Sequence, residues 1–201
     1  MTNQTRTTRA TYDAVAPRYL EKTRDGGFAY SWIESFVMGL SPGARVVDLG
    51  SGPGRDAVAL RGLGVTPVCV DFSLGMLRAG ADEYPCARVQ GDMLALPFPD
   101  AFAEGVWASA SLLHLSRSDF GCALHETVRV LRKSGRLTIM MKKGDGASWE
   151  TERYQKPRWF QYWSAAALDT ALAEAGFRID ASDEWIASSN TWLIRRCVAA
   201  V

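Results

Sequence analysis

A glycine-rich turn between two apolar segments constrains the fold of this 201-residue chain more than any other feature. The strand-like run Arg45–Leu49 leads into glycines at alternate positions, Gly50, Gly52 and Gly54, and a helix-compatible segment follows at 57–60. Strand, tight loop and helix together form the first half of a βαβ unit. Without a Cβ, glycine lets the backbone come close to a ligand, and the free N–H groups of the helix start face the same place. The sequence therefore predicts a ligand-binding loop.

Three acidic residues accompany these glycines, each at the end of a predicted strand. Asp48 lies just before the glycines, Asp71 ends the next apolar run at 67–70, and Asp92 follows a third run at 87–89. An acid at the tip of the second strand is placed to accept hydrogen bonds from both hydroxyls of a ribose. Nicotinamide dinucleotide folds share that acid but show G-x-G-x-x-G, whereas this chain has G-x-G-x-G. Asp48 would also repel a pyrophosphate and attract a cation.

These motifs in this order resemble a class I S-adenosylmethionine-dependent methyltransferase. The residues that carry the resemblance are Asp48, Gly50, Gly52, Gly54, Asp71, Gly91-Asp92-Met93 and Leu96-Pro97-Phe98. The resemblance covers roughly residues 10–180 and is nearest to small single-domain enzymes related to the ubiquinone-biosynthesis methyltransferases. It implies an α/β fold with a Rossmann-like, seven-stranded, mostly parallel sheet, an antiparallel C-terminal hairpin and helices on both faces.

The resemblance also implies which residues hold S-adenosylmethionine and its product S-adenosylhomocysteine. Tyr19, together with Arg24, would lie near the methionine carboxylate, Phe72 would cover one face of the adenine, and Met93 would give its ring a backbone donor. For Tyr19 and Phe72, ordinary packing is the alternative. The full cofactor-binding set comprises Tyr19, Arg24, Asp48, Gly50, Ser51, Gly52, Gly54, Asp71, Phe72, Ser73, Gly91, Asp92, Met93 and Ser109.

We expect one domain with four successive parts. They are an N-terminal helical cap at 1–43, a cofactor-binding core at 44–141, an aromatic substrate lid at 142–163, and a C-terminal helix and hairpin at 164–201. In the cap, Tyr12 and Tyr19 fall on one face of a helix. Pro17 predicts a kink or two short helices there, and residues 1–10 are expected to fray.

The lid is predicted from six aromatic residues between positions 149 and 163. It follows the fifth predicted strand, at the sheet edge where this fold carries ligand sites. We therefore expect it to line the pocket of a flat or aromatic substrate, and a small satellite core under a long loop is the alternative. The predicted substrate-binding residues are Tyr12, His114, Trp149, Tyr154 and Trp159.

His114 is the one histidine well placed to act as a general base, because it follows the fourth predicted strand at the same edge; a structural role in a turn is the alternative. The cofactor implied by the resemblance carries an activated methyl group, so the protein must mainly align the acceptor and exclude water. Since no base is convincing, we favour methylation of nitrogen in a small aromatic or heterocyclic metabolite. Methylation of oxygen with His114 as base is the alternative.

Charge and composition narrow the possible partners. A net charge of +1 without a basic tail argues against nucleic acid. The segment 109–115 also lacks the (Asp/Asn)-Pro-Pro-aromatic turn of base-modifying methyltransferases and the paired glutamates of arginine methyltransferases. An RNA or protein methyltransferase, or a cofactor-binding protein without methyl transfer, remains open.

The four cysteines, Cys69, Cys86, Cys122 and Cys197, are scattered, so we expect reduced thiols and no metal site. No apolar run approaches the roughly 20 residues that span a membrane. We expect a cytoplasmic monomer or weak homodimer that binds a small molecule and neither nucleic acid nor membrane.

Overall fold

The computed structural model describes residues 2–24, 30–187 and 190–200. Its main strands are β1 (Arg45–Leu49), β2 (Thr66–Asp71), β3 (Ala87–Gln90), β4 (Ala103–Ser109), β5 (Leu131–Lys142), β8 (Phe177–Ala187) and β9 (Asn190–Ala199). Its helices are α1 (Asn3–Thr23), α2 (Tyr30–Val37), α3 (Arg55–Gly62), α4 (Leu74–Ala79), α5 (Arg117–Val130) and α6 (Ala165–Glu174), with a 3-10 turn η1 (Leu112–His114). A separate hairpin consists of β6 (Ala147–Glu150) and β7 (Arg158–Gln161).

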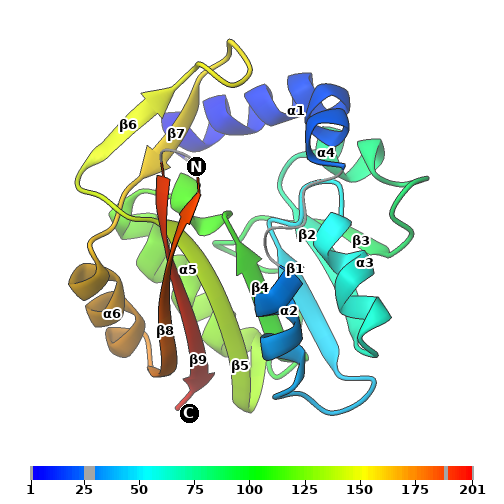
Figure 1. Ribbon diagram of the computed structural model, residues 1–201, viewed down its shortest axis with the longest axis vertical. Helices are drawn as coiled ribbons and strands as arrows, with labels where there is room; N and C mark the ends of the chain where they lie inside the picture. The colour runs from blue at the N-terminus through cyan, green and yellow to red at the C-terminus, as the bar shows by residue number, and fades with distance from the viewer. Residues whose placement is uncertain (1, 25–29, 188–189, 201) are drawn as a thin grey trace.

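The seven main strands form one sheet in the order β3-β2-β1-β4-β5-β9-β8, with helices around it (Figure 1). The strands β1 to β5 pair in parallel, and β9 runs antiparallel to both β5 and β8. The predicted fold class, including the antiparallel C-terminal hairpin, is confirmed.

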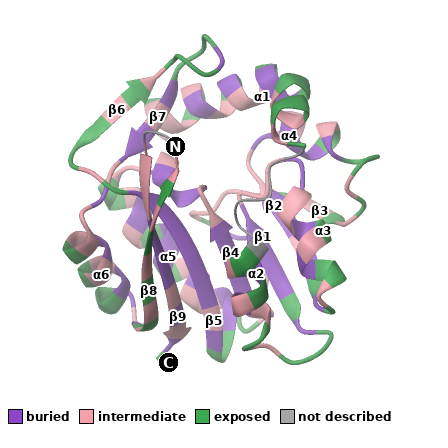
Figure 2. Cartoon of the chain, in the orientation of Figure 1, coloured by how far each residue is buried: buried purple, intermediate pink, exposed green. Residues whose placement is uncertain are grey.

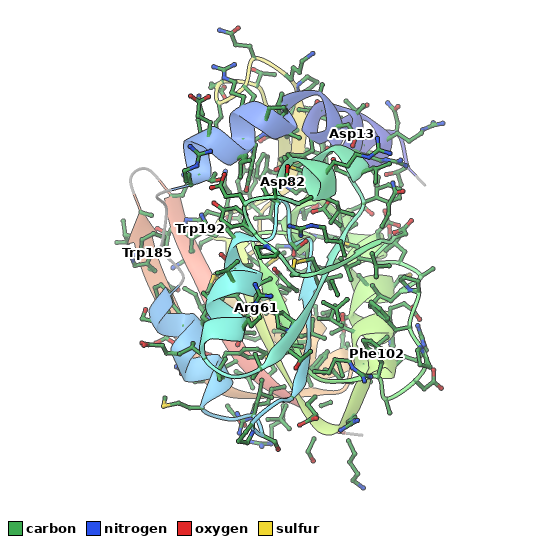
Figure 3. The ribbon with its side chains drawn as sticks, turned by 90° about the vertical axis from the view of Figure 1, so that its right-hand side faces the viewer. Asp13, Arg61, Asp82, Phe102, Trp185 and Trp192 are labelled. Atoms are coloured by element: carbon green, nitrogen blue, oxygen red, sulfur yellow. The ribbon has the colours of Figure 1, made fainter. Side chains whose placement is uncertain are left out.

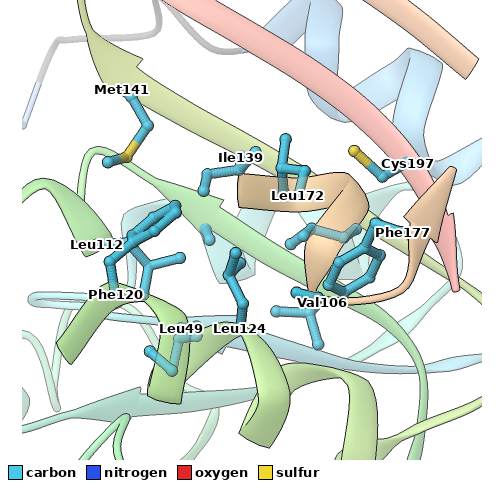
Figure 4. Packing of buried hydrophobic residues seen from close by; sticks show 14 of the residues in the cluster. Leu49, Val106, Leu112, Phe120, Leu124, Ile139, Met141, Leu172, Phe177 and Cys197 are labelled. Carbon is cyan, nitrogen blue, oxygen red and sulfur yellow. The ribbon is translucent and has the colours of Figure 1, made fainter. Parts of the chain in front are cut away.

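Both faces of the sheet are buried, as Figure 2 shows for its central strands. Because successive strand residues point to opposite faces, neighbours in β1 enter different cores. Val46 packs in a cluster with Phe36 of α2, whereas Val47 belongs to the larger cluster that contains Phe120 and Leu124 of α5. Figure 4 shows this larger cluster, which α6 also joins. Burial on both faces explains why the parallel strands read as continuous apolar runs.

Helix α1 lies across one end of the sheet and not against either face (Figure 1). The Thr2 side chain caps it by accepting a hydrogen bond from the Thr5 N–H at 3.2 Å. The helix then continues without interruption through Pro17. The expected fraying is therefore wrong for residues 3–10, Met1 lies outside the described residues, and the expected split into two short helices at Pro17 is wrong as well.

The middle of α1 is docked on the start of α4 by Asp13 (Figure 3). Its Oδ1 accepts hydrogen bonds from the Ser73 hydroxyl at 2.6 Å and the Gly75 N–H at 2.8 Å. A Cβ on Gly75 would lie 2.8 Å from the Asp13 carbonyl oxygen, so glycine permits this close approach.

A second set of hydrogen bonds ties α1 to the β6–β7 hairpin. The Thr8 hydroxyl oxygen accepts from the Trp159 N–H at 2.9 Å, and the Thr11 hydroxyl donates to the Pro157 carbonyl at 2.7 Å. Helix α1 is thus fixed to two parts of the chain that lie far apart in sequence.

Among the residues described, no helix is long and apolar enough to cross a membrane.

The buried position of Leu124 in the larger cluster gives a direct test of the core. Leu124 is 0% exposed, so Leu124→Ala should lower the free energy of unfolding by about 2–5 kcal/mol. Val58→Ala is the matched control on α3, because Val58 is 38% exposed and its truncation should change stability by less than about 0.5 kcal/mol. Urea unfolding measures both; equal effects would contradict the packing.

Candidate functional site

A cavity lies at the carboxyl ends of β1, β2 and β4, where the strand order reverses, and α1 covers it. In open α/β sheets this is the usual position of a ligand site. The cavity has a volume of about 160 Å³, and about 1140 Å³ of empty space when its open mouth is included. The predicted residues on its wall are Tyr12, Tyr19, Asp48, Gly50, Ser51, Gly52, Asp71, Phe72, Ser73, Asp92, Met93, Ser109 and His114.

Three predicted cofactor residues lie away from this wall. Arg24 forms a bidentate pair with Glu83, at 2.8 and 2.9 Å. Gly54 begins α3 in a left-handed conformation, with φ of 96°. Gly91 packs beneath the wall, where an added Cβ would come within 3.0 Å of Pro97. The structure therefore does not bring these three residues to the cavity.

The predicted aromatic residues of the lid also lie behind the wall. Trp149 is 41% exposed, and its ring packs edge-on against Trp159 at 5.5 Å. Tyr154 is buried behind Tyr19, with 5.9 Å between the ring centroids. These three of the five predicted substrate-binding residues thus pack the hairpin and its loop, Tyr154 against α1, while Trp159 reaches the site through its backbone carbonyl, which contacts His114.

Asp71 connects the loops that form the cavity floor. Its Oδ2 accepts a hydrogen bond from the Gly52 N–H at 2.8 Å, and its Oδ1 accepts one from the Ser73 N–H at 2.7 Å. Burial raises the pKa of Asp71 to about 6, although these two hydrogen bonds act in the opposite direction. A carboxylate offers about four acceptor positions, so Asp71 can also accept two hydroxyl groups of a ligand.

Asp48 gives the cavity a buried acid with an unused acceptor. The residue is 3% exposed, and within the described part of the chain its Oδ2 has no hydrogen-bond partner. Burial raises the pKa of Asp48 well above its usual range, and the nearby Asp56, Cys86 and Asp71 add to this effect. An ammonium group bound here would satisfy the free oxygen and offset the burial of the charge. This acid therefore fits the amino end of the expected cofactor.

At the first two glycines of the loop, a side chain would either clash with a neighbouring residue or fill part of the cavity. Gly50 and Gly52 have φ of 72° and 56°, which side chains rarely adopt. A Cβ on Gly50 would lie 2.2 Å from the Cβ of Ser111. A Cβ on Gly52 would have the Tyr19 ring as its one neighbour, at 3.9 Å, so it would project into the cavity between loop and helix. This cradle fits a ligand that lies against the backbone.

His114 is held by a chain of hydrogen bonds that fixes its protonation. Its Nδ1 lies 2.6 Å from the Trp159 carbonyl oxygen; a carbonyl cannot donate, so Nδ1 carries the proton. Its Nε2 then accepts from the Tyr12 hydroxyl at 2.8 Å, and the Tyr12 oxygen accepts from Arg158 at 3.3 Å. Desolvation lowers the pKa of His114 to about 4. The imidazole is neutral at pH 7, and both of its nitrogens are engaged.

Several wall residues were absent from the sequence-based prediction. They are Thr5, Thr8, Arg9, Thr23, Pro53, Arg55, Asp56, Met76, Ala110, Ser111 and Leu115. The spacing of Thr5, Thr8 and Tyr12 by three and four residues was an available helical signal, but the expectation of a frayed N-terminus obscured it. On this face Arg9 stacks over the Phe72 ring at 4.5 Å.

Residues 2–24, 30–187 and 190–200 contain no cluster of three or more potential His, Cys, Asp or Glu metal ligands.

Comparison with known sequences gives a match over the centre of the chain. Residues 47–139 match a family described as methyltransferase domain. The demethylmenaquinone methyltransferase of Mycobacterium marinum is 40% identical over 100 residues, which are 50% of this chain and 42% of that protein. The corresponding protein of Beutenbergia cavernae is 37% identical over 134 residues, covering 64% and 55%. The chain thus spans about half the length of the curated relatives it matches.

Solved structures share the fold over almost the whole chain. A 1,6-didemethyltoxoflavin-N1-methyltransferase of Burkholderia thailandensis, with 1,6-didemethyltoxoflavin and S-adenosylhomocysteine bound, has a TM-score of 0.78. It is 20% identical, and the match covers 96% of this chain and 87% of that one. The [4+2]-cyclase SpnF has a TM-score of 0.79 at 18% identity, covering 97% of each chain. One neighbour is named for methyl transfer and the other for cyclisation, so the likeness establishes the fold.

The raised pKa of Asp48 predicts how stability depends on pH. Below the usual carboxyl pKa, Asp48 is protonated in both folded and unfolded protein and has no effect. As the pH rises above this usual pKa, Asp48 ionises in the unfolded chain before it ionises in the folded protein. This difference lowers the free energy of unfolding by about 1.4 kcal/mol for each unit by which folding raises the pKa of Asp48. Asp48→Asn should therefore stabilise the ligand-free protein at pH 7 and have a smaller effect near pH 4. Urea unfolding at both pH values tests this; a gain independent of pH would contradict it.

Proposed function

We propose that the protein binds S-adenosylmethionine beneath α1 and transfers its methyl group to a small molecule, because residues 47–139 match a methyltransferase domain family and the similar curated proteins are demethylmenaquinone methyltransferases. The acceptor is an aromatic or heterocyclic metabolite, and nitrogen is the preferred acceptor atom. The protein works as a monomer or weak homodimer, without a nucleic-acid or membrane partner.

The cavity floor supplies the groups that this cofactor needs. When bound, S-adenosylmethionine provides a methyl group already activated by a sulfonium. Asp71 accepts the ribose hydroxyls, and the free oxygen of Asp48 accepts the ammonium of the methionine part. The bare backbone at Gly52 lets the amino-acid part pass under Tyr19, and Phe72 covers the adenine from the side of Arg9.

The roof of the cavity supports a flat acceptor. Tyr12 and Tyr19 of α1 present their rings edge to face at 5.9 Å, and the His114 ring lies 5.3 Å from Tyr12. All three residues line the cavity. Aromatic walls of this kind bind planar rings through offset or edge contacts. The relatives are named for demethylmenaquinone, and one structural neighbour is named for methylation at a nitrogen, N1.

The hydrogen bonding of His114 carries the preference for nitrogen. Its Nε2 is occupied by the Tyr12 hydroxyl and its Nδ1 by the Trp159 carbonyl, so neither nitrogen is open to an acceptor. A pKa of about 4 also makes the imidazole a weak base at neutral pH. A neutral amine already has the lone pair that attacks the methyl group. The chain therefore needs to position such an acceptor and exclude water.

Methylation of oxygen is the second candidate, and the same hydrogen bond favours it by another route. Tyr12 could take the proton of a hydroxyl acceptor while passing its own proton to Nε2 of His114, at 2.8 Å. Burial raises the pKa of Tyr12 above its usual value, which opposes a tyrosinate intermediate in this relay. A cofactor-binding protein without methyl transfer is the alternative from another class, in view of the likeness to a cyclase.

Cofactor binding is tested with Asp71→Ala. Loss of a charged acceptor for two hydroxyls, and of the hydrogen bonds to Gly52 and Ser73, should weaken S-adenosylmethionine binding by at least about 100-fold in calorimetry. Asp82→Ala is the control, because Asp82 is exposed and outside the cavity (Figure 3). Unchanged affinity after Asp71→Ala would refute this cofactor site.

The acceptor atom is tested by screening amines and phenols for cofactor turnover, with mass spectrometry of the products. If nitrogen is methylated, His114→Ala should lower kcat by less than about 10-fold. If oxygen is methylated with His114 in a proton relay, both His114→Ala and Tyr12→Phe should lower kcat by about 10²–10⁴-fold. His125→Ala, on the exposed side of α5, is the control. The absence of any methylated product across the screen would favour the non-methylating alternative.

A further inference from the structure

Two cysteines, one in β2 and one next to β3, lie in contact beneath the glycine-rich loop. Cys69 lies in β2 and is 0% exposed, whereas Cys86 lies just before β3 and is half-buried. Both are free thiols in the structure, and their Sγ atoms are 2.7 Å apart. A disulfide has an S–S distance of about 2.05 Å, so a small movement would bring the two sulfurs into bonding distance. Their separation of 17 residues gave no sequence signal.

Arg88 places a positive charge beside one of these two sulfurs. Its Nη1 donates to Cys86 Sγ at 2.8 Å, while its Nη2 donates to the carbonyls of Gly80 at 2.6 Å and Pro53 at 3.2 Å. These backbone carbonyls hold the guanidinium in position without neutralising it. Such an environment favours a thiolate at Cys86.

The two thiols consequently differ in character. The hydrogen bond from Cys69 and the charges of Arg88 and Arg61 lower the pKa of Cys86 to about 7, although partial burial opposes this. For Cys69 the same hydrogen bond, together with burial, raises the pKa. The pair thus contains an accessible, acidic thiol in contact with a buried, protonated one.

We propose that Cys69 and Cys86 form a redox-active dithiol that hydroperoxides oxidise to a reversible disulfide. The Cys86 thiolate attacks the terminal oxygen of the hydroperoxide; the O–O bond breaks, Cys86 becomes a sulfenic acid, and the departing alkoxide or hydroxide takes a proton from water. The Cys69 thiol then attacks the Cys86 sulfur. An S–S bond forms, the S–O bond breaks, and water leaves with the thiol proton. Two thiols lose two electrons and the peroxide gains them.

The disulfide would lie directly under the glycine-rich loop. An ideal Cβ on Gly54 would be 3.1 Å from Cys69 Sγ and 3.3 Å from Cys86 Sγ, so the loop rests on both sulfurs. Arg88 links the same pair to the loop through the Pro53 carbonyl. Oxidation would remove the thiolate that Arg88 binds, and with it one support of the loop. Oxidation of this pair would require neither an acceptor nor methyl transfer.

The test uses the 201-residue chain, reduced, desalted and exposed to a small excess of hydrogen peroxide. After alkylation of free thiols and proteolysis, mass spectrometry should find the Cys69 and Cys86 peptides joined, about 2 Da lighter than their sum, and separate again after dithiothreitol. Cys122 is the internal control, because it is exposed on α5. Cys86 should react at least about 10-fold faster than Cys122.

A variant separates the roles of the two thiols. In Cys69→Ala, Cys86 should accumulate as a sulfenic acid that dimedone traps, because the resolving thiol is missing. If this variant does not fold, the linked peptide of the unaltered protein still decides the matter. Oxidation of Cys86 to a sulfinic acid while Cys69 remains alkylatable, or reaction of Cys86 no faster than Cys122, would overturn the proposal.

Discussion

The carboxylate of Asp71 is the interaction on which the site depends, because it ties three segments of the chain to one point. It ends β2, accepts from Gly52 in the loop after β1, and accepts from Ser73 at the start of α4. Ser73 in turn donates to Asp13, which docks α1. The floor and the roof of the cavity are therefore joined through Asp71, Ser73 and Asp13. Its pKa of about 6 reflects the burial that this position requires.

The cavity has two walls of different origin. The floor, with Asp48, Asp71 and the glycines, comes from the segment 47–139 that matches known methyltransferase domains. The roof comes from α1, and the β6–β7 hairpin supports it from behind. His114 lies where the two walls meet, since it follows β4, accepts a hydrogen bond from Tyr12 and donates one to the Trp159 carbonyl. The floor and the roof are therefore formed by different parts of the chain.

The sequence predicted the floor better than the roof, for a physical reason. Strand, glycine loop and helix follow one another locally, so Gly52 and Asp71 could be placed from periodicity alone. The roof depends on pairs such as Thr8 with Trp159, which are 151 residues apart and leave no periodic pattern. The helix-breaking tendency of Pro17 was overestimated, because the docking of α1 through Thr8, Thr11 and Asp13 outweighs the loss of one hydrogen bond. The aromatic residues at 149–163 indicated packing around the hairpin more than a cavity wall.

The joint fixation of α1 and the hairpin has a consequence for how this scaffold can change. Thr8 and Thr11 bind the backbone of Trp159 and Pro157, so each segment is shaped to the other. Neither can be transplanted from a homologue alone without leaving polar groups unmatched. If both were exchanged together, the roof of the cavity would change while its floor stayed the same. Variation of the cavity roof on this scaffold should therefore proceed by paired replacement of α1 and the hairpin.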